Sequence, residues 1–178
     1  MKVRTLILCL GMLAASFVAQ SAWASEQQGS ARIEQHVRHE LNMLPYGNVF
    51  DYMAFRVDPS GTVTLTGEVT QPIVKDQAGK AAKRVEGVEH VDNQIKVLPV
   101  SFFDARLRAQ LYRSIYGYPT MQRYALGVNA PIRIIVEDGH VTLLGYVNNE
   151  GDKIIAGMQA NSVPGIFSVD NQLKVDRS

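Results

Sequence analysis

Apolar and polar residues alternate strictly through one short stretch of the chain, and the same alternation returns 78 positions later. The first stretch reads GTVTLTGEV over residues 61–69, and the second reads GHVTLLGYV over residues 139–147. Strict alternation is typical of a strand that buries one face and exposes the other. Turn-forming residues precede each stretch, Asp58-Pro59-Ser60-Gly61 and Glu137-Asp138-Gly139, so the pattern predicts two β-hairpins.

Apolar residues at helical spacing predict two helices in each half of the chain. Three of the stripes are Ile33/Val37/Leu41/Leu44, Val74/Ala78/Ala81/Ala82/Val85 and Phe103/Leu107/Leu111/Ile115, and the fourth helix is predicted over residues 152–163. Ser101 and Asp104 form a capping-box-like start for the third helix. A further strand follows the second helix of each half, at residues 91–97 and 169–175.

A gapless repeat joins these elements into one unit that occurs twice. Residues 61–97 align with residues 139–175, and 18 of the 37 aligned positions are identical, which indicates one supersecondary unit used twice. Each unit reads helix, strand, strand, helix, strand, and the last strand can pair in parallel through a right-handed crossover. The predicted fold class is α+β: two αββαβ units, each a three-stranded mixed sheet with two helices on one face. We place the units at residues 30–98 and 101–176, joined by the short linker Leu98-Pro99-Val100.

Two repeated residues invite a structural explanation. Asn93 and Asn171, within the doubled motif VDNQ, lie in phase with the apolar face, and we expect each to bond the backbone of a neighbouring turn, because an unpaired buried amide is costly. Gly67 and Gly145 fall on the buried faces of their strands. There a missing side chain lets a helix come close or lets the strand bend.

The first 24 residues have the three parts of a secretory signal peptide. Lys2 and Arg4 precede an apolar run over residues 6–18, and Ala22-Trp23-Ala24 predicts cleavage between Ala24 and Ser25. The one cysteine, Cys9, lies inside the apolar run and follows Leu8, which does not suit a lipoprotein signal. We therefore expect a soluble protein exported to the periplasm.

Charge and cysteine content narrow the possible functions. Without residues 1–24 the chain has 18 − 2 = 16 Lys and Arg against 17 Asp and Glu, a net charge of −1. This balance argues against nucleic acid as a partner, because a nucleic-acid footprint requires a basic excess. No cysteine remains after residue 24, so thiol chemistry is excluded there.

The sequence predicts neither an enzyme nor a metal or cofactor site, and no small-molecule substrate. No nucleophile elbow or Ser-His-Asp spacing is present. His36, His39 and Glu40 share a helix at spacings that could present metal ligands. His39, however, falls on the side away from the apolar stripe, and no third ligand follows at a suitable spacing.

The repeated unit resembles the BON domain of exported bacterial proteins. The resemblance rests on V-x-L-x-G-x-V, a helix, and V-x-G-[VI]-x-x-V-x-N-x-[IL]-x-V, found at residues 63–69 with 85–97 and at 141–147 with 163–175. The tandem arrangement is similar to the periplasmic OsmY type and to dual-BON outer-membrane lipoproteins. The resemblance implies a non-catalytic envelope module that binds phospholipid and supports envelope integrity or stress protection.

The candidate binding site is an aromatic and basic patch around the third helix. Tyrosine suits the headgroup level of a membrane, and arginine suits phosphate. The predicted residues for an anionic phospholipid surface are Arg106, Tyr112, Arg113, Tyr116, Tyr118 and Arg123. One alternative is that these tyrosines pack between the two units while the arginines are solvated. The alternative function is a periplasmic chaperone-like or protein-interaction module that holds exported client proteins at an apolar or sheet-edge surface.

Overall fold

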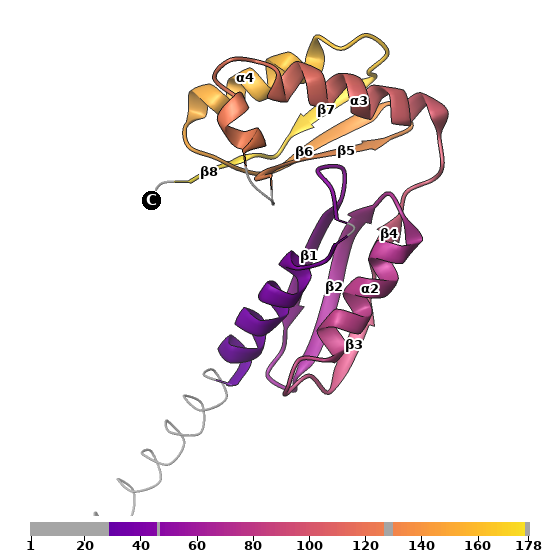
Figure 1. Cartoon of the computed structure of the whole chain (residues 1–178), viewed down its shortest axis with the longest axis vertical. Helices are drawn as coiled ribbons and strands as arrows, with labels where there is room; N and C mark the ends of the chain where they lie inside the picture. The colour runs from indigo at the N-terminus through magenta and orange to yellow at the C-terminus, as the bar shows by residue number, and fades with distance from the viewer. Residues whose placement is uncertain (1–28, 46, 127–129, 177–178) are drawn as a thin grey trace, which may run out of the picture.

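The structure is a computed structural model and describes residues 29–45, 47–126 and 130–176. The predicted leader, including Ala24 and Ser25, lies outside the described residues. Two units of the same design follow one another along the chain (Figure 1). Each unit combines two helices with a mixed sheet, so the predicted α+β fold of two αββαβ units is confirmed.

In the first unit, a helix over residues 29–42 precedes all the strands. The elements that follow it are β1 (Tyr52–Val57), β2 (Thr62–Val69), α2 (Pro72–Lys83), β3 (His90–Asn93) and β4 (Lys96–Val97). The second unit contains α3 (Phe102–Tyr116), the 3-10 helix η1 (Gln122–Ala125), β5 (Ile132–Glu137), β6 (His140–Val147), α4 (Glu150–Asn161), β7 (Ser168–Asn171) and β8 (Lys174–Val175). The connection between α3 and β5 thus contains one short helix.

The sheets have the predicted topology, with one interruption. β1 pairs antiparallel with β2, and β2 pairs in parallel with both β3 and β4. β5, β6, β7 and β8 repeat this arrangement. The predicted last strand of each unit is therefore two short strands. In the first unit the side-chain oxygen of Asn93 accepts a hydrogen bond from the Ile95 N–H (3.2 Å), a local bond that competes with regular pairing.

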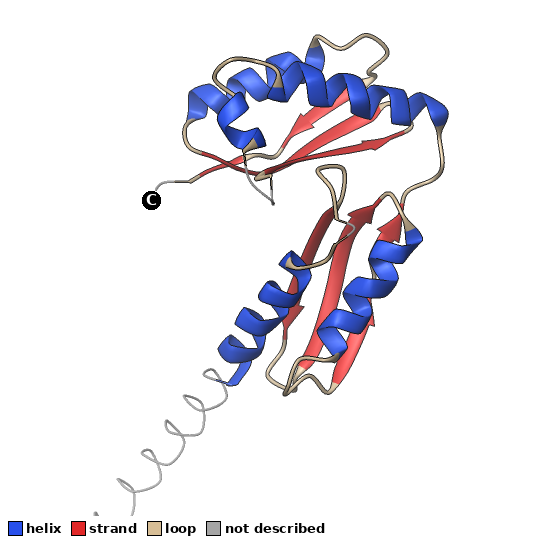
Figure 2. Ribbon diagram, viewed as in Figure 1, coloured by secondary structure: helices blue, strands red, loops and turns tan. Residues whose placement is uncertain are grey.

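Both helices of a unit cover the same face of its sheet (Figure 2). Val63, Leu65 and Val69 of β2 face Val37 of the opening helix and Ala78 of α2. Fully burying an apolar side chain of this size stabilises the fold by about 1.5–3 kcal/mol. The second core repeats this design with Leu107, Leu111, Val141, Leu143 and Ala156.

The repeated asparagines bond the backbone just after them, as expected, and in addition each bonds to a helix. The Asn93 side-chain NH₂ donates to the Lys75 carbonyl of α2 (2.8 Å). Gly79 makes room for this contact, because a Cβ on Gly79 would lie 2.9 Å from the amide nitrogen of Asn93. Each asparagine therefore ties a third strand to its crossover helix. The second unit repeats the arrangement with Asn171, Lys153 and Gly157.

The strand glycines face a neighbouring strand, and not a helix. Gly67 has a φ of 123° and Gly145 a φ of 109°, a region that favours glycine. A Cβ on Gly67 would overlap the carbonyl oxygen of Tyr52 in β1, and one on Gly145 would overlap that of Pro131. The missing side chain therefore lets the backbone of the preceding strand, and not a helix, come close.

Asp104 has a different role from the one its spacing predicted. The Asp104 N–H does donate to the Ser101 hydroxyl (3.1 Å), which caps α3. The Asp104 carboxylate, however, does not return to the cap. It accepts the N–H groups of Asp138 (3.0 Å) and Gly139 (2.9 Å) in the β5–β6 turn. α3 is therefore fixed to the hairpin of its own sheet.

Candidate functional site

A compact loop of the first unit meets the second unit, and we call residues 47–51 the junction loop. The Asn48 N–H donates to the Asp51 carboxylate (3.1 Å), and the Phe50 N–H donates to the Asn48 side-chain oxygen (2.7 Å). Asp51 is buried, and its second oxygen accepts from the Thr70 N–H (2.6 Å) and hydroxyl (2.8 Å). These bonds fix the loop on the end of its own sheet, and that end faces the second sheet in Figure 1.

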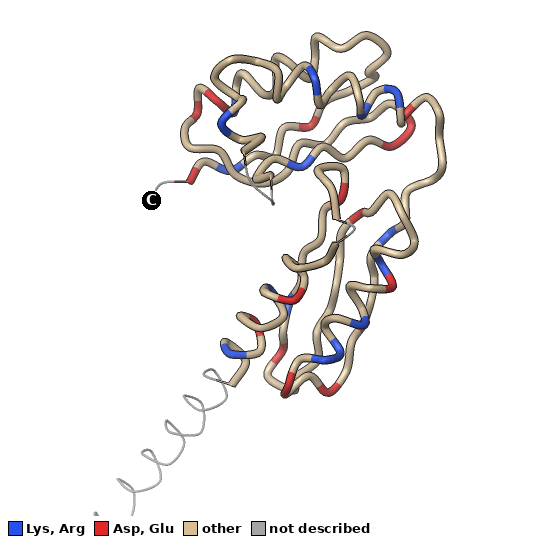
Figure 3. The backbone as a smooth tube through the Cα atoms, in the orientation of Figure 1, with Lys and Arg blue, Asp and Glu red and all other residues tan. Residues whose placement is uncertain are grey.

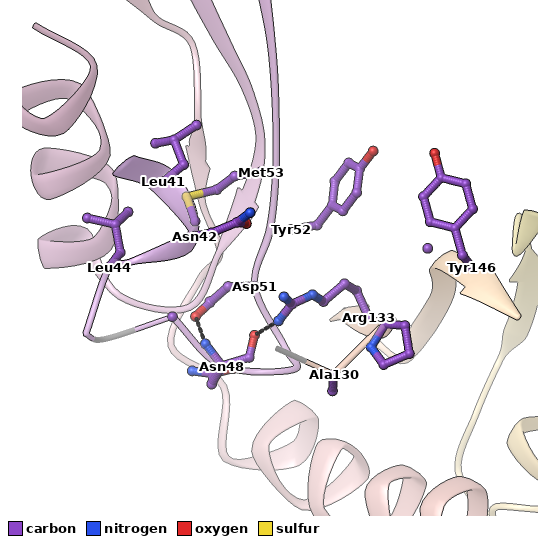
Figure 4. A pocket seen from close by; sticks show the side chains of 13 residues that line it. Leu41, Asn42, Leu44, Asn48, Asp51, Tyr52, Met53, Ala130, Arg133 and Tyr146 are labelled. Carbon is purple, nitrogen blue, oxygen red and sulfur yellow. Dashed lines mark hydrogen bonds between the residues drawn. The ribbon is translucent and has the colours of Figure 1, made fainter. Parts of the chain in front are cut away.

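Hydrogen bonds and an aromatic contact join the junction loop to the second unit. The Ile134 N–H donates to the Val49 carbonyl (2.8 Å), and the Arg133 guanidinium donates to the Asn48 carbonyl (2.8 Å; Figure 4). The Phe50 ring meets the Tyr112 ring of α3 edge-on, with centroids 6.5 Å apart. Tyr112 therefore packs at least partly between the units, as the alternative interpretation of the patch described.

Groups from α3 and the junction loop also occupy the outer edge of β5. The buried Tyr116 hydroxyl donates to the Ile132 carbonyl (2.6 Å), and burial raises the pKa of this phenol. The Arg108 guanidinium donates to the Val136 carbonyl (2.5 Å), and burial lowers its pKa. Because the Ile134 N–H also donates to Val49, three backbone groups on this edge of β5 already have hydrogen-bond partners within the protein. The arrangement disfavours β5 as a place where a client strand could add.

A cavity of about 560 Å³ opens between the junction loop and α3. We call it the junction cavity, and the residues that matter for its chemistry are Val49, Phe50, Tyr112, Arg113, Tyr116 and Arg133. A smaller hollow of about 290 Å³ lies on the other side of the loop, where Asn42, Asp51, Tyr52 and Tyr146 line it (Figure 4). Arg133 lines both hollows. Burial lowers the pKa of Arg133, and nearby Tyr116 and Asp51 oppose that shift.

η1 is fixed to the start of α4 through Asp152. The buried Asp152 carboxylate pairs with the Arg123 guanidinium and accepts from the Tyr124 hydroxyl (2.5 Å) and the Asn149 side chain (3.0 Å). A carboxylate in the first turn of a helix also interacts favourably with the helix dipole. Arg123 therefore has an intramolecular partner, and the hydrogen bond to Asp152 raises its pKa.

Three phenylalanines gather at the opposite end of α3, and we call Phe102, Phe103 and Phe167 the phenylalanine tip. Phe102 is 90% exposed and Phe167 is 71% exposed. Phe103 belongs to the predicted apolar stripe of α3, but it is 40% exposed. Its ring packs over Gly165 at the edge of the core and meets Phe167, with ring centroids 6.4 Å apart. Arg106 is exposed one helical turn further along α3.

The first unit has no such tip. Under the repeat alignment, Glu89 stands where the second unit has Phe167. Ile33 packs over Gly87 as Phe103 packs over Gly165, which places Arg32 at the position of Phe102. The opening helix and α2 of the first unit carry charged residues of both signs (Figure 3). The apolar tip is thus a property of the second unit.

The six predicted site residues do not form one surface. Tyr112 and Arg113 line the junction cavity with the buried Tyr116, while Arg123 pairs with Asp152. Tyr118 is 37% exposed just beyond α3, and Arg106 lies near the phenylalanine tip. Sequence reasoning did not single out Phe167, Phe50 or Arg133. At one aligned position of the repeat the first copy has Glu89 and the second has Phe167, and this difference could have marked Phe167. No local pattern marks Phe50 or Arg133.

Within the described residues, no three His, Cys, Asp or Glu side chains gather closely enough to hold a metal ion. In the same parts of the chain, none of the helices has both the length and the apolar character that crossing a bilayer requires. The described surface combines an exposed apolar tip, the neighbouring Arg106, and a junction cavity that Arg113 and Arg133 line.

The fold defines a protein built from two small α+β modules in tandem. The family model of the BON domain matches residues 30–99 and 122–177, so the chain belongs to the BON domain family. It is 31% identical over 118 residues to the outer membrane lipoprotein DolP of Haemophilus influenzae. That match covers 64% of this chain and 58% of DolP, a little over half of the relative's length. Family and relative together support an envelope-associated BON protein.

Two solved structures show a weaker similarity. The first is CdsD of Chlamydia trachomatis, a structural protein of the type III secretion system. It matches with a TM-score of 0.30 and 13% identity over 80% of this chain and 91% of that chain. The C-terminal domain of CdsD matches with a TM-score of 0.30 and 15% identity over 80% of this chain and 96% of that one.

Proposed function

We propose that this BON protein docks reversibly on anionic phospholipid in the cell envelope, through the phenylalanine tip and Arg106. The observation that carries the proposal is the exposure of Phe102 and Phe167 at one end of the second unit. Large apolar side chains gathered on an otherwise polar surface mark an interaction site. Arg106 forms no ion pair among the described residues, so its guanidinium is available for a lipid phosphate.

The proposed mechanism combines two weak terms. The phenyl rings enter the boundary between headgroups and acyl chains, and each ring fully buried there contributes about 1.5–3 kcal/mol. A cation at an anionic surface adds about 1 kcal/mol, and salt screens this term. Their sum favours reversible attachment. This surface keeps Arg106 from the predicted patch but leaves out Tyr116 and Arg123, because both have partners within the protein.

The proposal includes the predicted leader over residues 1–24 and a periplasmic location. A protein released there could reach both the inner and the outer membrane, and docking on either one supports envelope integrity or protection under stress. We propose no catalytic step, cofactor or metal for this function. The alternative role in holding client proteins receives no support at the β5 edge, because Tyr116, Val49 and Arg108 occupy it.

Co-sedimentation with vesicles tests the proposal. The purified protein should bind phosphatidylglycerol vesicles at low salt and bind phosphatidylcholine vesicles much less. The double substitution Phe102→Ser/Phe167→Ser should weaken binding to phosphatidylglycerol by about tenfold or more, because it removes most of the buried apolar area. Arg106→Gln should weaken binding less and reduce its salt dependence.

The matched control removes an exposed apolar side chain elsewhere on the second unit. Met158 of α4 is exposed to a similar degree as Phe167, so Met158→Ser should leave vesicle binding unchanged. If the tip variant and the Met158 variant bind equally well, the tip is not the docking surface. Failure of the unchanged protein to sediment with phosphatidylglycerol would end the proposal itself.

A further inference from the structure

The junction cavity takes no part in the proposed docking on phospholipid, and its lining is both aromatic and basic. Its walls come from both units: Val49 and Phe50 from the junction loop, and Tyr112 and Tyr116 from α3. At about 560 Å³ it falls within the size range of small-molecule sites. The Tyr112 and Tyr116 rings lie 5.0 Å apart and the Phe50 ring meets Tyr112 edge-on, so one wall of the cavity is aromatic.

The charged side chains that line the cavity are basic. Arg113 and Arg133 line it, and none of the described Asp and Glu residues does. Neither arginine forms an ion pair among the described residues. The nearby carboxylate of Asp51 lines the smaller hollow, where Thr70 and Asn48 already donate to its oxygens. The cavity therefore presents two cations that form no ion pair among the described residues, with Asp51 as a more distant counter-charge to Arg133.

Arg133 lines the cavity with most of its N–H donors available to a ligand. It is half-buried, and burial disfavours its charged form. Within the described parts of the chain, Nη1 is the one guanidinium nitrogen that donates a hydrogen bond, to the Asn48 carbonyl, although a guanidinium offers five N–H donors. An anion in the cavity would accept the remaining donors and offset the cost of holding this charge away from water. Arg113 stands at the more exposed side of the same cavity.

We propose that the junction cavity binds a small amphiphilic anion, a molecule with one phosphate or carboxylate group and an apolar chain or ring. Arg133 and Arg113 contact the anionic group, and the apolar part lies against Phe50, Tyr112 and Tyr116. This ligand is a single dissolved molecule, unlike the lipid surface that the phenylalanine tip contacts. Because both units contribute walls, the bound ligand stabilises their contact.

Calorimetric titration with dodecyl phosphate, below its critical micelle concentration, tests the inference. The purified protein should bind dodecyl phosphate at a single site. It should bind inorganic phosphate and dodecyltrimethylammonium at least about tenfold more weakly, because the first lacks the chain and the second has the opposite charge. Equal affinity for the phosphate and the ammonium amphiphile would overturn the proposal.

Variants locate the site and separate it from membrane docking. Arg133→Gln and Arg113→Gln should each lower the affinity for dodecyl phosphate by about tenfold. Arg106→Gln and Phe102→Ser/Phe167→Ser should leave it unchanged, although they weaken vesicle binding. Unchanged affinity in the Arg113→Gln variant, whose side chain is exposed, would overturn the proposal. So would amide NMR shifts that gather at the tip and leave residues 47–51 and 109–116 unmoved.

Discussion

Tyr116 lies in the wall of the junction cavity, with its ring buried and its hydroxyl bonded to the Ile132 carbonyl at 2.6 Å. Burial raises the pKa of this phenol above its usual 10.0. Below pH 10 the phenol is neutral in both the folded and the unfolded chain, so its contribution to stability is fully present there. Above pH 10 the unfolded chain releases the proton while the folded protein retains it, and this favours unfolding.

The free energy of unfolding should therefore fall as the pH rises above about 10, by up to about 1.4 kcal/mol per pH unit from this group. Tyr116→Phe should be about 1 kcal/mol less stable near pH 8, because it loses the hydrogen bond to Ile132. Its stability should then decline less steeply between pH 10 and pH 11. Urea unfolding at several pH values measures both effects, and equal slopes for the two proteins would contradict the argument.

The turn between β5 and β6 depends on α3 through a single carboxylate. Asp104→Ala would leave the buried Gly139 N–H and its neighbour Asp138 N–H without their acceptor. An unsatisfied buried donor costs about 1–3 kcal/mol, so we expect a total loss of about 2–4 kcal/mol in urea unfolding. The Ser101 cap is retained, and the helix itself should persist in circular dichroism.

Asp58→Ala is the matched control for Asp104→Ala. In the first unit's turn, Asp58 is more accessible to water than Asp104 and accepts from the Ser60 and Thr62 N–H groups of its own hairpin. Water can replace an accessible acceptor, so this variant should lose clearly less stability. Equal losses for the two variants would contradict the argument that burial makes the Asp104 contacts the more costly ones to lose.

Local spacing was enough to predict the elements, because the buried and exposed positions of a helix or strand recur at fixed intervals. It did not predict where polar side chains find their partners. Asp104 matched a capping box three residues from Ser101, yet its carboxylate bonds a turn more than thirty residues away. Asn93 bonds the nearby Ile95 N–H, as expected, but its NH₂ also reaches Lys75 in the preceding helix, which the spacing did not predict. Such partners depend on the packing of whole elements.

The two units meet through a loop, and its contacts explain why the candidate site could be predicted only in part. The tyrosines on α3 and Arg106 stood out because aromatic and basic residues interleave in the sequence. Whether a given ring is buried depends on where the junction loop lies. No periodicity encodes that position, so Phe50 and Arg133 escaped prediction although both line the junction cavity.

Phe50→Ala should loosen the contact between the units. It removes the edge-on contact with Tyr112 and a partly buried ring, a loss of about 1–2 kcal/mol. Each unit keeps its own core, so both should remain folded while tumbling more independently. NMR relaxation measures this as a wider difference between the rotational correlation times of the two units.

Phe167→Ala serves as the control here, because it also removes one phenyl ring but lies away from the junction. Its two correlation times should match those of the unchanged protein. If Phe50→Ala gives the same times as well, the hydrogen bonds of Val49 and Arg133 are sufficient to hold the units together.

Each crossover helix contains a glycine that leaves room for the asparagine of the following strand, and the two residues occur together in both units. Gly79 precedes Asn93, and Gly157 precedes Asn171, by the same fourteen residues. An alanine at the glycine would push the amide away from the helix carbonyl, and an asparagine lost from the strand would remove the reason for the glycine. The two positions should therefore vary together among related sequences. A search for glycine, thirteen residues and asparagine across a predicted helix and strand would recognise this module in chains that share little else.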